Sequence, residues 1–160
     1  MASGEPISVL MVCLGNICRS PMAEAVFRHV AKENNLLDKF GVIDSAGTAG
    51  YHAGDEPDRR TQRVCRDNGV PVSHTARQVT RQDFYNFDYI FAMDKNNQRD
   101  LESMKPKDAA KSKILMFGEF GDGKALQDPY YGGESGFKVN FEQCKKSSEG
   151  FMKTVLGADI

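Results

Sequence analysis

The sequence predicts a single α/β domain over residues 1–160, in which a doubly wound sheet of four parallel strands carries helices on both faces. Short apolar runs alternate along the chain with segments of helical periodicity, the pattern of consecutive β-α-β units. No internal repeat, low-complexity tract or long linker interrupts this alternation. The length of 160 residues is sufficient for one domain with a sizeable core.

The expected strands are the short apolar runs. The first run, Ile-Ser-Val-Leu-Met-Val, has the nearly continuous apolar character of a strand that is buried on both faces. The expected strands cover residues 7–12, 41–45, 88–93 and 113–117. Alternation with helices makes these strands parallel, and we expect the flavodoxin-like order 2-1-3-4.

The first two expected helices have recognisable ends. The first covers residues 21–34, with Ser20 as its N-cap and Pro21 at its first helical position. The second covers residues 57–68; it begins with a proline and is followed by Gly69. Both helices would lie directly after loops that leave the carboxyl ends of strands.

The second half of the chain continues the alternation. Thr80 and Asp83 are spaced like a capping signal for a short helix near Phe84. The remaining expected elements are a helix over residues 96–104, a glycine-rich loop over residues 118–133 and a terminal helix over residues 137–156.

The residues that carry chemistry follow the first strand directly. Cys13 stands at the carboxyl end of that strand, five residues separate it from Arg19, and a helix then begins with Ser-Pro. A tight loop that ends at a helix N-terminus points backbone N–H groups at a central space and forms an anion site. Gly15 and Asn16 suit the positive-φ conformations that such a loop requires.

This arrangement predicts a phosphate site with a nucleophile. Arg19 can bind two oxygens of a phosphate dianion at once, and the same donors favour a thiolate at Cys13. The thiolate would attack phosphorus and form a cysteinyl-phosphate intermediate. A buried strand-end cysteine beside a surface arginine is the plainer interpretation, but strand, spacing and helix start agree with the catalytic one. A Walker loop is excluded because the Gly-Lys-Ser/Thr ending is missing.

Asp128 is the candidate general acid, since a phosphatase must protonate its leaving group. It precedes Pro129 in the glycine-rich loop after the last strand. Asp-Pro taken alone indicates only a turn, and that interpretation stays open. The adjacent Tyr130 and Tyr131 could stack on the phenyl ring of an aryl phosphate.

These residues resemble the low-molecular-weight protein tyrosine phosphatase (acid phosphatase) family. The resemblance follows the family's order over nearly the whole chain, in residues 12–24, 44–48, 76–78, 87–90, 92–94 and 128–132. It implies metal-independent hydrolysis of phosphotyrosine in proteins and of small aryl phosphates, without a cofactor or a bound metal. Inorganic phosphate and other oxyanions would be competitive ligands.

The resemblance also implies roles for single residues. Cys13 would be the nucleophile, Arg19 the phosphate clamp and Asp128 the general acid. A polar network of Asn16, Ser20, Ser45 and His74 would hold the loop in shape, and Cys18 would be a resolving thiol that forms a disulfide with Cys13 under peroxide. The implied substrate-binding and phosphate-binding residues are Leu14, Gly15, Asn16, Ile17, Cys18, Ser20, Tyr51 and Tyr130.

Net charge and cysteine content limit which binding partners and which cellular compartment we expect. The net charge of −1 gives no global attraction to nucleic acid or to an anionic membrane. Four cysteines in a chain without an export signal indicate reduced thiols and a cytoplasmic protein, and their spacing argues against structural zinc. We expect a monomer or weak self-association. The cluster of Arg59, Arg60, Arg63 and Arg66 is expected to form a solvated helix face.

Three other functions fit parts of the sequence. A thiol-dependent arsenate reductase would use the same anion loop, but it needs a closely spaced pair of later cysteines, which this chain lacks. A non-enzymatic phosphate-binding module would be expected to lose the nucleophile or the acid. An acyl-phosphatase or small phosphomonoesterase differs only in the leaving group, and only the Tyr130–Tyr131 pair favours aryl phosphates.

Overall fold

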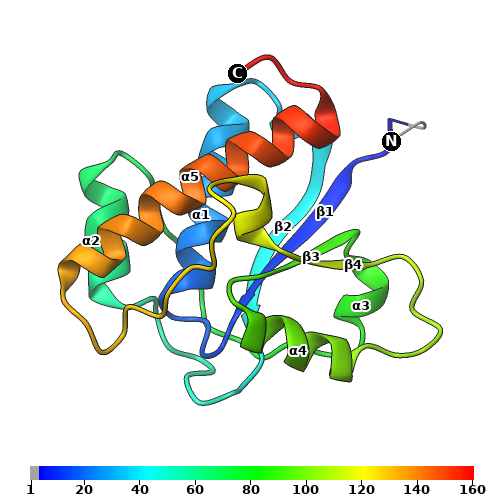
Figure 1. Cartoon of the computed structure of the whole chain (residues 1–160), viewed down its shortest axis with the longest axis horizontal. Helices are drawn as coiled ribbons and strands as arrows, with labels where there is room; N and C mark the ends of the chain where they lie inside the picture. The colour runs from blue at the N-terminus through cyan, green and yellow to red at the C-terminus, as the bar shows by residue number, and fades with distance from the viewer. Residues whose placement is uncertain (1–3) are drawn as a thin grey trace.

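The computed structural model describes residues 4–160, which wrap helices around one sheet (Figure 1). Residues 1–3 lie outside the described part, so a single domain over the whole of 1–160 stays a prediction. In chain order the elements are β1 (Ile7–Cys13), α1 (Arg19–Glu33), η1 (Leu37–Lys39), β2 (Phe40–Gly47), α2 (Arg59–Asp67), α3 (Asp83–Asn86), β3 (Tyr89–Ala92), α4 (Lys95–Met104), β4 (Lys113–Met116), η2 (Phe117–Phe120) and α5 (Glu134–Leu156).

β1 lies inside the sheet, between β2 and β3. The strand order is β2-β1-β3-β4 and the pairings are parallel, which confirms the predicted fold class and strand order. Val12 is paired with Ala46 on one side and with Ala92 on the other. The chain goes to one side of β1 for β2 and to the other for β3. The carboxyl end of β1, at Cys13, is therefore the point where strand order reverses.

Helices cover both faces of the sheet (Figure 1). On one face α1 packs against α5, and α2 contacts both; on the other, α4 packs against β3 and β4. The ring of Phe151 is central to the α1–α5 side, 5.0–5.7 Å from the rings of Phe27, Tyr89, Phe91 and Phe120. Within residues 4–160, no helix has the length and apolar character to cross a bilayer.

The N-terminus of α1 differs from the expectation. The helix begins at Arg19, two residues before the expected start, and its N-cap is Cys18. The prediction that Ser20 is the N-cap is wrong, because Ser20 lies inside the first turn. Its hydroxyl instead contacts Cys13 and Asn16, so the polar group next to the proline serves the loop and not the helix end.

Other helix and strand boundaries differ from the expected ones by a few residues. β2 extends over Phe40–Gly47, and the expected loop over residues 118–133 begins with η2. α2 begins at Arg59 because the Asp58 carboxylate accepts the N–H of Arg60 as an N-cap, 2.8 Å away. The short helix has Gln82 as its N-cap, although Asp83 accepts the N–H of Thr80 as expected.

The arginine-rich face of α2 is only partly solvated. Arg59 and Arg66 are exposed, as expected for charged residues on a surface helix. Arg63 forms an ion pair with Glu134 at the start of α5. Arg60 is half-buried against the segment that precedes α5. The expectation of a uniformly solvated face is therefore wrong for Arg60.

α5 passes very close to η2 at Gly150. A Cβ atom on Gly150 would lie 1.7 Å from the carbonyl oxygen of Phe120. Glycine inside a helix is unfavourable by about 1 kcal/mol relative to alanine, so a reason for it is needed. The close approach of the two backbones supplies that reason, and it brings the rings of Phe120 and Phe151 to within 5.3 Å.

We predict that Gly150→Ala destabilises the protein. The added methyl group must displace the Phe120 backbone, and this cost exceeds the gain in helix propensity; we expect a net loss of about 2 kcal/mol in the free energy of unfolding. Urea denaturation measures it. Gly132→Ala is the control, because a Cβ there meets only the Pro129 carbonyl oxygen, at an ordinary distance of 3.7 Å. Equal stability of wild type and Gly150→Ala would contradict the close approach.

Candidate active site

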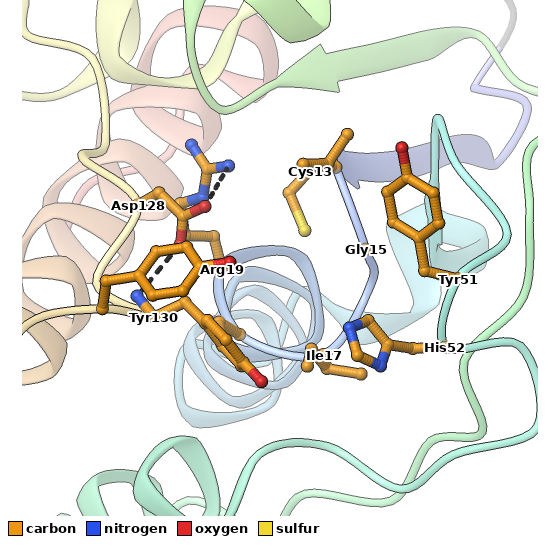
Figure 2. A pocket seen from close by; sticks show the side chains of 11 residues that line it. Cys13, Gly15, Ile17, Arg19, Tyr51, His52, Asp128 and Tyr130 are labelled. Atoms are coloured by element: carbon orange, nitrogen blue, oxygen red, sulfur yellow. Dashed lines mark hydrogen bonds and ion pairs between the residues drawn. The ribbon is translucent and has the colours of Figure 1, made fainter.

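A pocket opens at the carboxyl end of β1 (Figure 2). The loop after β1, the segment around residues 51 and 52, and the segment after η2 form its walls. Figure 2 shows the sulfur of Cys13 pointing into the space between these segments. The lining residues are Cys13, Leu14, Gly15, Ile17, Cys18, Arg19, Tyr51, His52, Asp128, Tyr130 and Tyr131.

The loop between β1 and α1 has the form of an anion cradle. Among the described residues, the backbone N–H groups of residues 14–18 are paired with no acceptor in the protein. Asn16 has a φ of 60°, as expected, but Gly15 does not have a positive φ. Glycine at position 15 is explained by contact, since a Cβ there would lie 2.9 Å from Cδ2 of His52. Unpaired donors at a helix N-terminus bind anions.

The side chain of Asn16 is fully buried behind the loop. Its Nδ2 donates to the hydroxyls of Ser20 (2.8 Å) and Ser45 (3.0 Å). Its Oδ1 accepts the backbone N–H of Arg77 (2.9 Å) and lies 2.7 Å from Nε2 of His74. The four residues of the expected network are thus in contact. Asn16 and Ser20 support the loop from behind and do not line the pocket.

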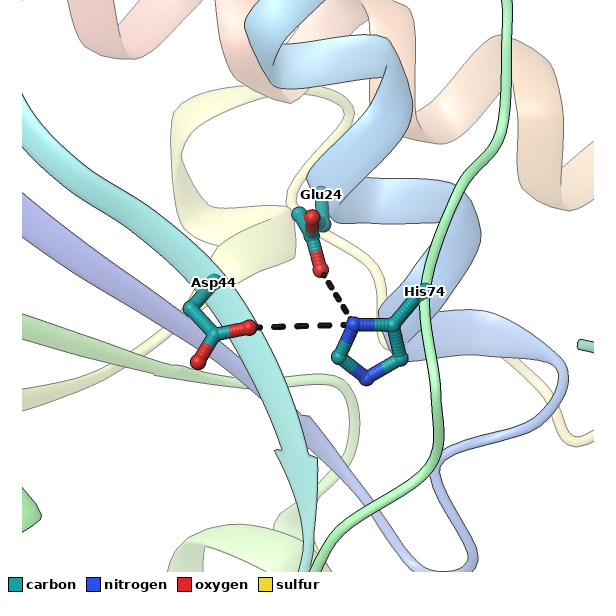
Figure 3. Close-up of side chains that lie close together, drawn as sticks. All are labelled: Glu24, Asp44 and His74. Carbon is teal, nitrogen blue, oxygen red and sulfur yellow. Dashed lines mark ion pairs between the residues drawn. The ribbon is translucent and has the colours of Figure 1, made fainter. Parts of the chain in front are cut away.

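His74 lies between acceptors on both sides of its ring. Because the Asn16 oxygen cannot donate, Nε2 must carry a hydrogen; Nδ1 faces the carboxylates of Glu24 (3.2 Å) and Asp44 (3.7 Å) (Figure 3). These three side chains lie close enough together to hold a metal ion. Arg28 also pairs with Glu24, and Arg77 pairs with Asp44, so each carboxylate already has a cationic partner.

Arg19 lies at the start of α1 with its side chain only 3% exposed. Its Nη1 donates to Asp94 (2.5 Å) and to the carbonyl oxygen of Leu126 (3.0 Å). Its Nη2 lies 3.7 Å from Asp128. Burial opposes the charged form, but the negative charges at Cys13, Asp94 and Asp128 outweigh it and raise the pKa of the Arg19 guanidinium. The cation is therefore fixed in place beside the sulfur of Cys13.

Asp94 is a site residue that the sequence analysis did not single out. It follows β3 and caps α4 in a capping box with Asn97, accepting its N–H at 2.8 Å. Its other oxygen accepts from Arg19. Two features of the sequence could have identified it. Asp94 directly follows a strand that lies next to β1, and the spacing Asp-x-x-Asn is that of a capping box.

Asp128 lies at the pocket mouth, across from Cys13 (Figure 2). Its Oδ1 accepts the N–H of Tyr130 (3.1 Å), a hydrogen bond that forms a local turn. Asp128 also lines the pocket, so the turn interpretation and a place in the site are both correct. Its side chain is 41% exposed, in contrast to Arg19. A partly solvated carboxyl that lines the same pocket as the sulfur can meet a leaving group on the open side of the pocket.

Aromatic and apolar side chains form the outer wall of the pocket. Leu14, Tyr51 and Tyr130 lie there, where the family resemblance placed them. His52 and Tyr131 also line it. The sequence analysis gave His52 no role in binding and considered Tyr131 only as part of an aromatic pair with Tyr130. The rings of Tyr130 and Tyr131 are 4.9 Å apart and nearly perpendicular. A flat substrate group entering toward Cys13 would pass between these walls.

The other three thiols are buried. Burial and the negative charges of Asp58 and Cys13 raise the pKa of Cys18, which lies in the loop. Burial raises the pKa of Cys65 to about 12 and also raises that of Cys144. Cys18 lines the pocket with Cys13, which fits a resolving role. Their pairing in a disulfide stays a prediction, since the structure has both as free thiols.

Residues 8–159 match the family model described as "Low molecular weight phosphotyrosine protein phosphatase". This chain belongs to that family. The phosphatase of Schizosaccharomyces pombe is 47% identical over 152 residues, which are 93% of this chain and 97% of that protein. A protein tyrosine phosphatase from Entamoeba histolytica, solved with Hepes in the active site, is 40% identical with a TM-score of 0.87, covering 94% of this chain and 98% of that one.

The family includes a second specificity among its solved structures. A Drosophila arginine phosphatase is 39% identical to this chain with a TM-score of 0.87, over 94% of this chain and 99% of that one. Family membership therefore establishes the phosphatase fold and chemistry. Which leaving group the site accepts has to be inferred from the side chains that line the pocket.

We predict that Asp94→Asn lowers kcat/KM for aryl phosphates roughly tenfold, because Arg19 loses the charge that orients it. Steady-state kinetics measures this loss. Asparagine caps helices as well as aspartate, so the melting temperature should hardly change. Unchanged kcat/KM at an unchanged melting temperature would show that Asp94 serves α4 alone.

We predict that iodoacetamide at neutral pH alkylates Cys13 before the other cysteines. Cys13 faces the pocket beside Arg19, whereas the other three are buried with raised pKa values and remain thiols. Peptide mapping by mass spectrometry identifies the labelled residue, and inorganic phosphate should slow the labelling. Faster labelling of another cysteine, or labelling that ignores phosphate, would contradict the prediction.

Proposed function

We propose that this chain carries out the reaction of its family, the hydrolysis of phosphotyrosine in proteins and of small aryl phosphates, with Cys13 as the nucleophile. The observation that carries the proposal is the convergence of three groups on one pocket: the sulfur of Cys13, the buried guanidinium of Arg19 and the carboxyl of Asp128 (Figure 2). Cys13 and Arg19 stand at the two ends of one loop, and Asp128 comes from the segment between η2 and α5.

In the first step, the Cys13 thiolate attacks phosphorus and a bond forms between sulfur and phosphorus. The bond from phosphorus to the phenolic oxygen breaks, and protonated Asp128 gives its proton to that oxygen. The phenol leaves, and a cysteinyl phosphate remains. The Ser20 hydroxyl, 3.0 Å from the sulfur, is placed to donate to the thiolate before attack.

In the second step, the Asp128 carboxylate accepts a proton from water and the water oxygen attacks phosphorus. The phosphorus–sulfur bond breaks, which releases inorganic phosphate and restores the thiolate. One residue thus serves as acid and then as base. The partial exposure of Asp128 suits both tasks, because the phenol must leave and water must enter by the same side.

The transition state carries negative charge on the equatorial oxygens of phosphorus. The unpaired N–H groups of residues 14–18 and the forked guanidinium of Arg19 are the donors that face this charge. Asn16 and its partners fix these donors before substrate arrives, so little reorganisation is needed. The protein's own groups supply the positive charge, which supports a reaction without a metal ion.

We predict that Cys13→Ser reduces turnover of 4-nitrophenyl phosphate to background and that Asp128→Asn lowers it about a hundredfold or more. The assay contains a chelator and runs at mildly acidic pH. Cys144→Ala, a buried thiol on α5, is the control and should keep the wild-type rate. Turnover by Cys13→Ser at the wild-type rate would overturn the mechanism.

The preference for tyrosine is tested in the same assay. Phosphotyrosine and phosphoarginine peptides of one sequence are compared, because an arginine phosphatase is among the relatives. Leu14, Tyr51 and Tyr130 at the mouth support the aryl substrate. Turnover of the phosphoarginine peptide alone would contradict it.

We further propose that the protein works in the cytoplasm, since four free cysteines fit a reducing compartment. Phosphoproteins are its substrates, and inorganic phosphate should compete with them for the loop. The monomeric or weakly associating state stays a prediction.

A further inference from the structure

The half-buried guanidinium of Arg60 lies against the segment that carries Asp128. Arg60 belongs to the first turn of α2. Its Nη2 donates to the carbonyl oxygen of Tyr130 (3.0 Å) and its Nη1 to that of Gly132 (3.2 Å). Its guanidinium also stacks over the ring of Phe137 at 4.5 Å. One side chain thus holds the backbone on the far side of Asp128 and the start of α5.

Asp58 fixes the direction of the Arg60 side chain. Its Oδ1 accepts from Nε (3.0 Å) and its Oδ2 from Nη2 (3.0 Å), a fork-to-fork contact that a lysine could not make. Burial opposes the ionised carboxyl, but the hydrogen bonds and charge of Arg60 outweigh it and hold the pKa of Asp58 below its ordinary value. The pair therefore stays charged at neutral pH.

The same turn of α2 is attached to the phosphate loop. The backbone N–H of Asp58 donates to the carbonyl oxygen of Ile17 (2.8 Å). The hydroxyl of Thr61 donates to the carbonyl oxygen of Cys18 (3.1 Å). The backbone of Arg60 thus belongs to a turn that is hydrogen-bonded to the phosphate loop. Its guanidinium contacts the segment that carries the acid.

Asp128 itself has few contacts that could fix its position. Its own carboxylate accepts the nearby Tyr130 N–H and lies 3.7 Å from Arg19. Before it, the Leu126 backbone accepts from Arg19 (3.0 Å) and donates to Met93 (2.9 Å), and the Gln127 carbonyl oxygen accepts from Asn140 of α5 (3.2 Å). After it, Arg60 supplies two hydrogen bonds, at Tyr130 and Gly132.

We propose that Arg60 is a positioning residue for the general acid: it ties the Tyr130–Gly132 backbone to the phosphate loop, so that the Asp128 carboxyl reaches the leaving oxygen. The inference rests on the proposed role of Asp128. Arg60 touches neither the phosphate nor the sulfur. Its loss should weaken proton delivery and leave phosphate binding intact.

The test is Arg60→Gln, with Arg59→Gln as the matched control on the exposed side of the same helix. kcat/KM is measured for phenyl phosphate, whose leaving group has a pKa of about 10 like tyrosine, and for 4-nitrophenyl phosphate, whose leaving group is more acidic. Proton delivery matters more for the first. We expect Arg60→Gln to lower kcat/KM roughly thirtyfold for phenyl phosphate and only about threefold for 4-nitrophenyl phosphate. Arg59→Gln should change neither.

Two further measurements separate positioning from general damage. The inhibition constant of inorganic phosphate should stay within about twofold of wild type, since the loop is intact. In an Asp128→Asn background, Arg60→Gln should cost less than about twofold, because the group that it positions is already gone. If the glutamine variant does not fold, Arg60→Lys replaces it, because lysine keeps the positive charge but cannot make the two-pronged guanidinium contact. The same dependence on substrate is expected.

The outcomes distinguish this inference from the proposed function. If Asp128→Asn shows the strong dependence on leaving group and Arg60→Gln and Arg60→Lys do not, Arg60 is not a positioning residue. The inference also fails if the variants lose the same factor on both substrates, or if phosphate inhibition weakens with kcat/KM. If Asp128→Asn itself shows no dependence, the assignment of the acid is wrong.

Discussion

The conformation of the phosphate loop depends on the buried amide of Asn16. Its φ of 60° turns the loop so that successive N–H groups face one space, a conformation that costs about 1–2 kcal/mol in a residue other than glycine. Hydrogen bonds to α1, to β2 and to the segment of residues 74–77 satisfy both the nitrogen and the oxygen of this amide. An unpaired buried amide would be expensive, so these contacts lock one loop geometry. The shape of the anion cradle is therefore set from behind the loop, by side chains that do not line the pocket.

The buried charges around the loop are arranged in matched groups. Arg19 is held by Asp94 on the pocket side, while behind the loop Glu24 pairs with Arg28 and Asp44 pairs with Arg77. A buried charge without a partner is strongly destabilising, and this pairing allows a cation to stay in the site before substrate arrives. A substrate dianion then adds its charge where unpaired N–H groups and the free edge of the guanidinium remain.

The sequence predicted the sheet and the nucleophile because both depend on local patterns. Apolar runs and cysteine-to-arginine spacing are continuous in the chain, so strand order, Cys13 and Arg19 could be expected from them. The walls of the pocket were expected only from the family resemblance. The contacts of Arg19 with Asp94 and of Arg60 with Tyr130 join residues that are 75 and 70 positions apart. No local pattern records such pairs. Local capping rules made Ser20 the N-cap for a related reason, because a serine beside a proline usually caps a helix. Its contact with Asn16 agrees instead with the network that the family resemblance implied.

The site combines a rigid half with a more open half, and the chemistry needs both. Stabilising charge on phosphorus requires donors that do not move, and Cys13, Asn16 and Arg19 are at most 3% exposed. Exchange of a phenol for water requires an acid that solvent can reach, and Asp128 lies on a segment whose neighbour Tyr131 is 94% exposed. An acid on an open segment would be poorly placed unless something related it to the rigid half. Before the acid, the Leu126 backbone is bonded to Arg19 and to Met93. After it, Arg60 starts from a turn bonded to the phosphate loop and ends on the acid's segment, so this segment is related to the rigid half on both sides of Asp128 while the mouth of the pocket stays open.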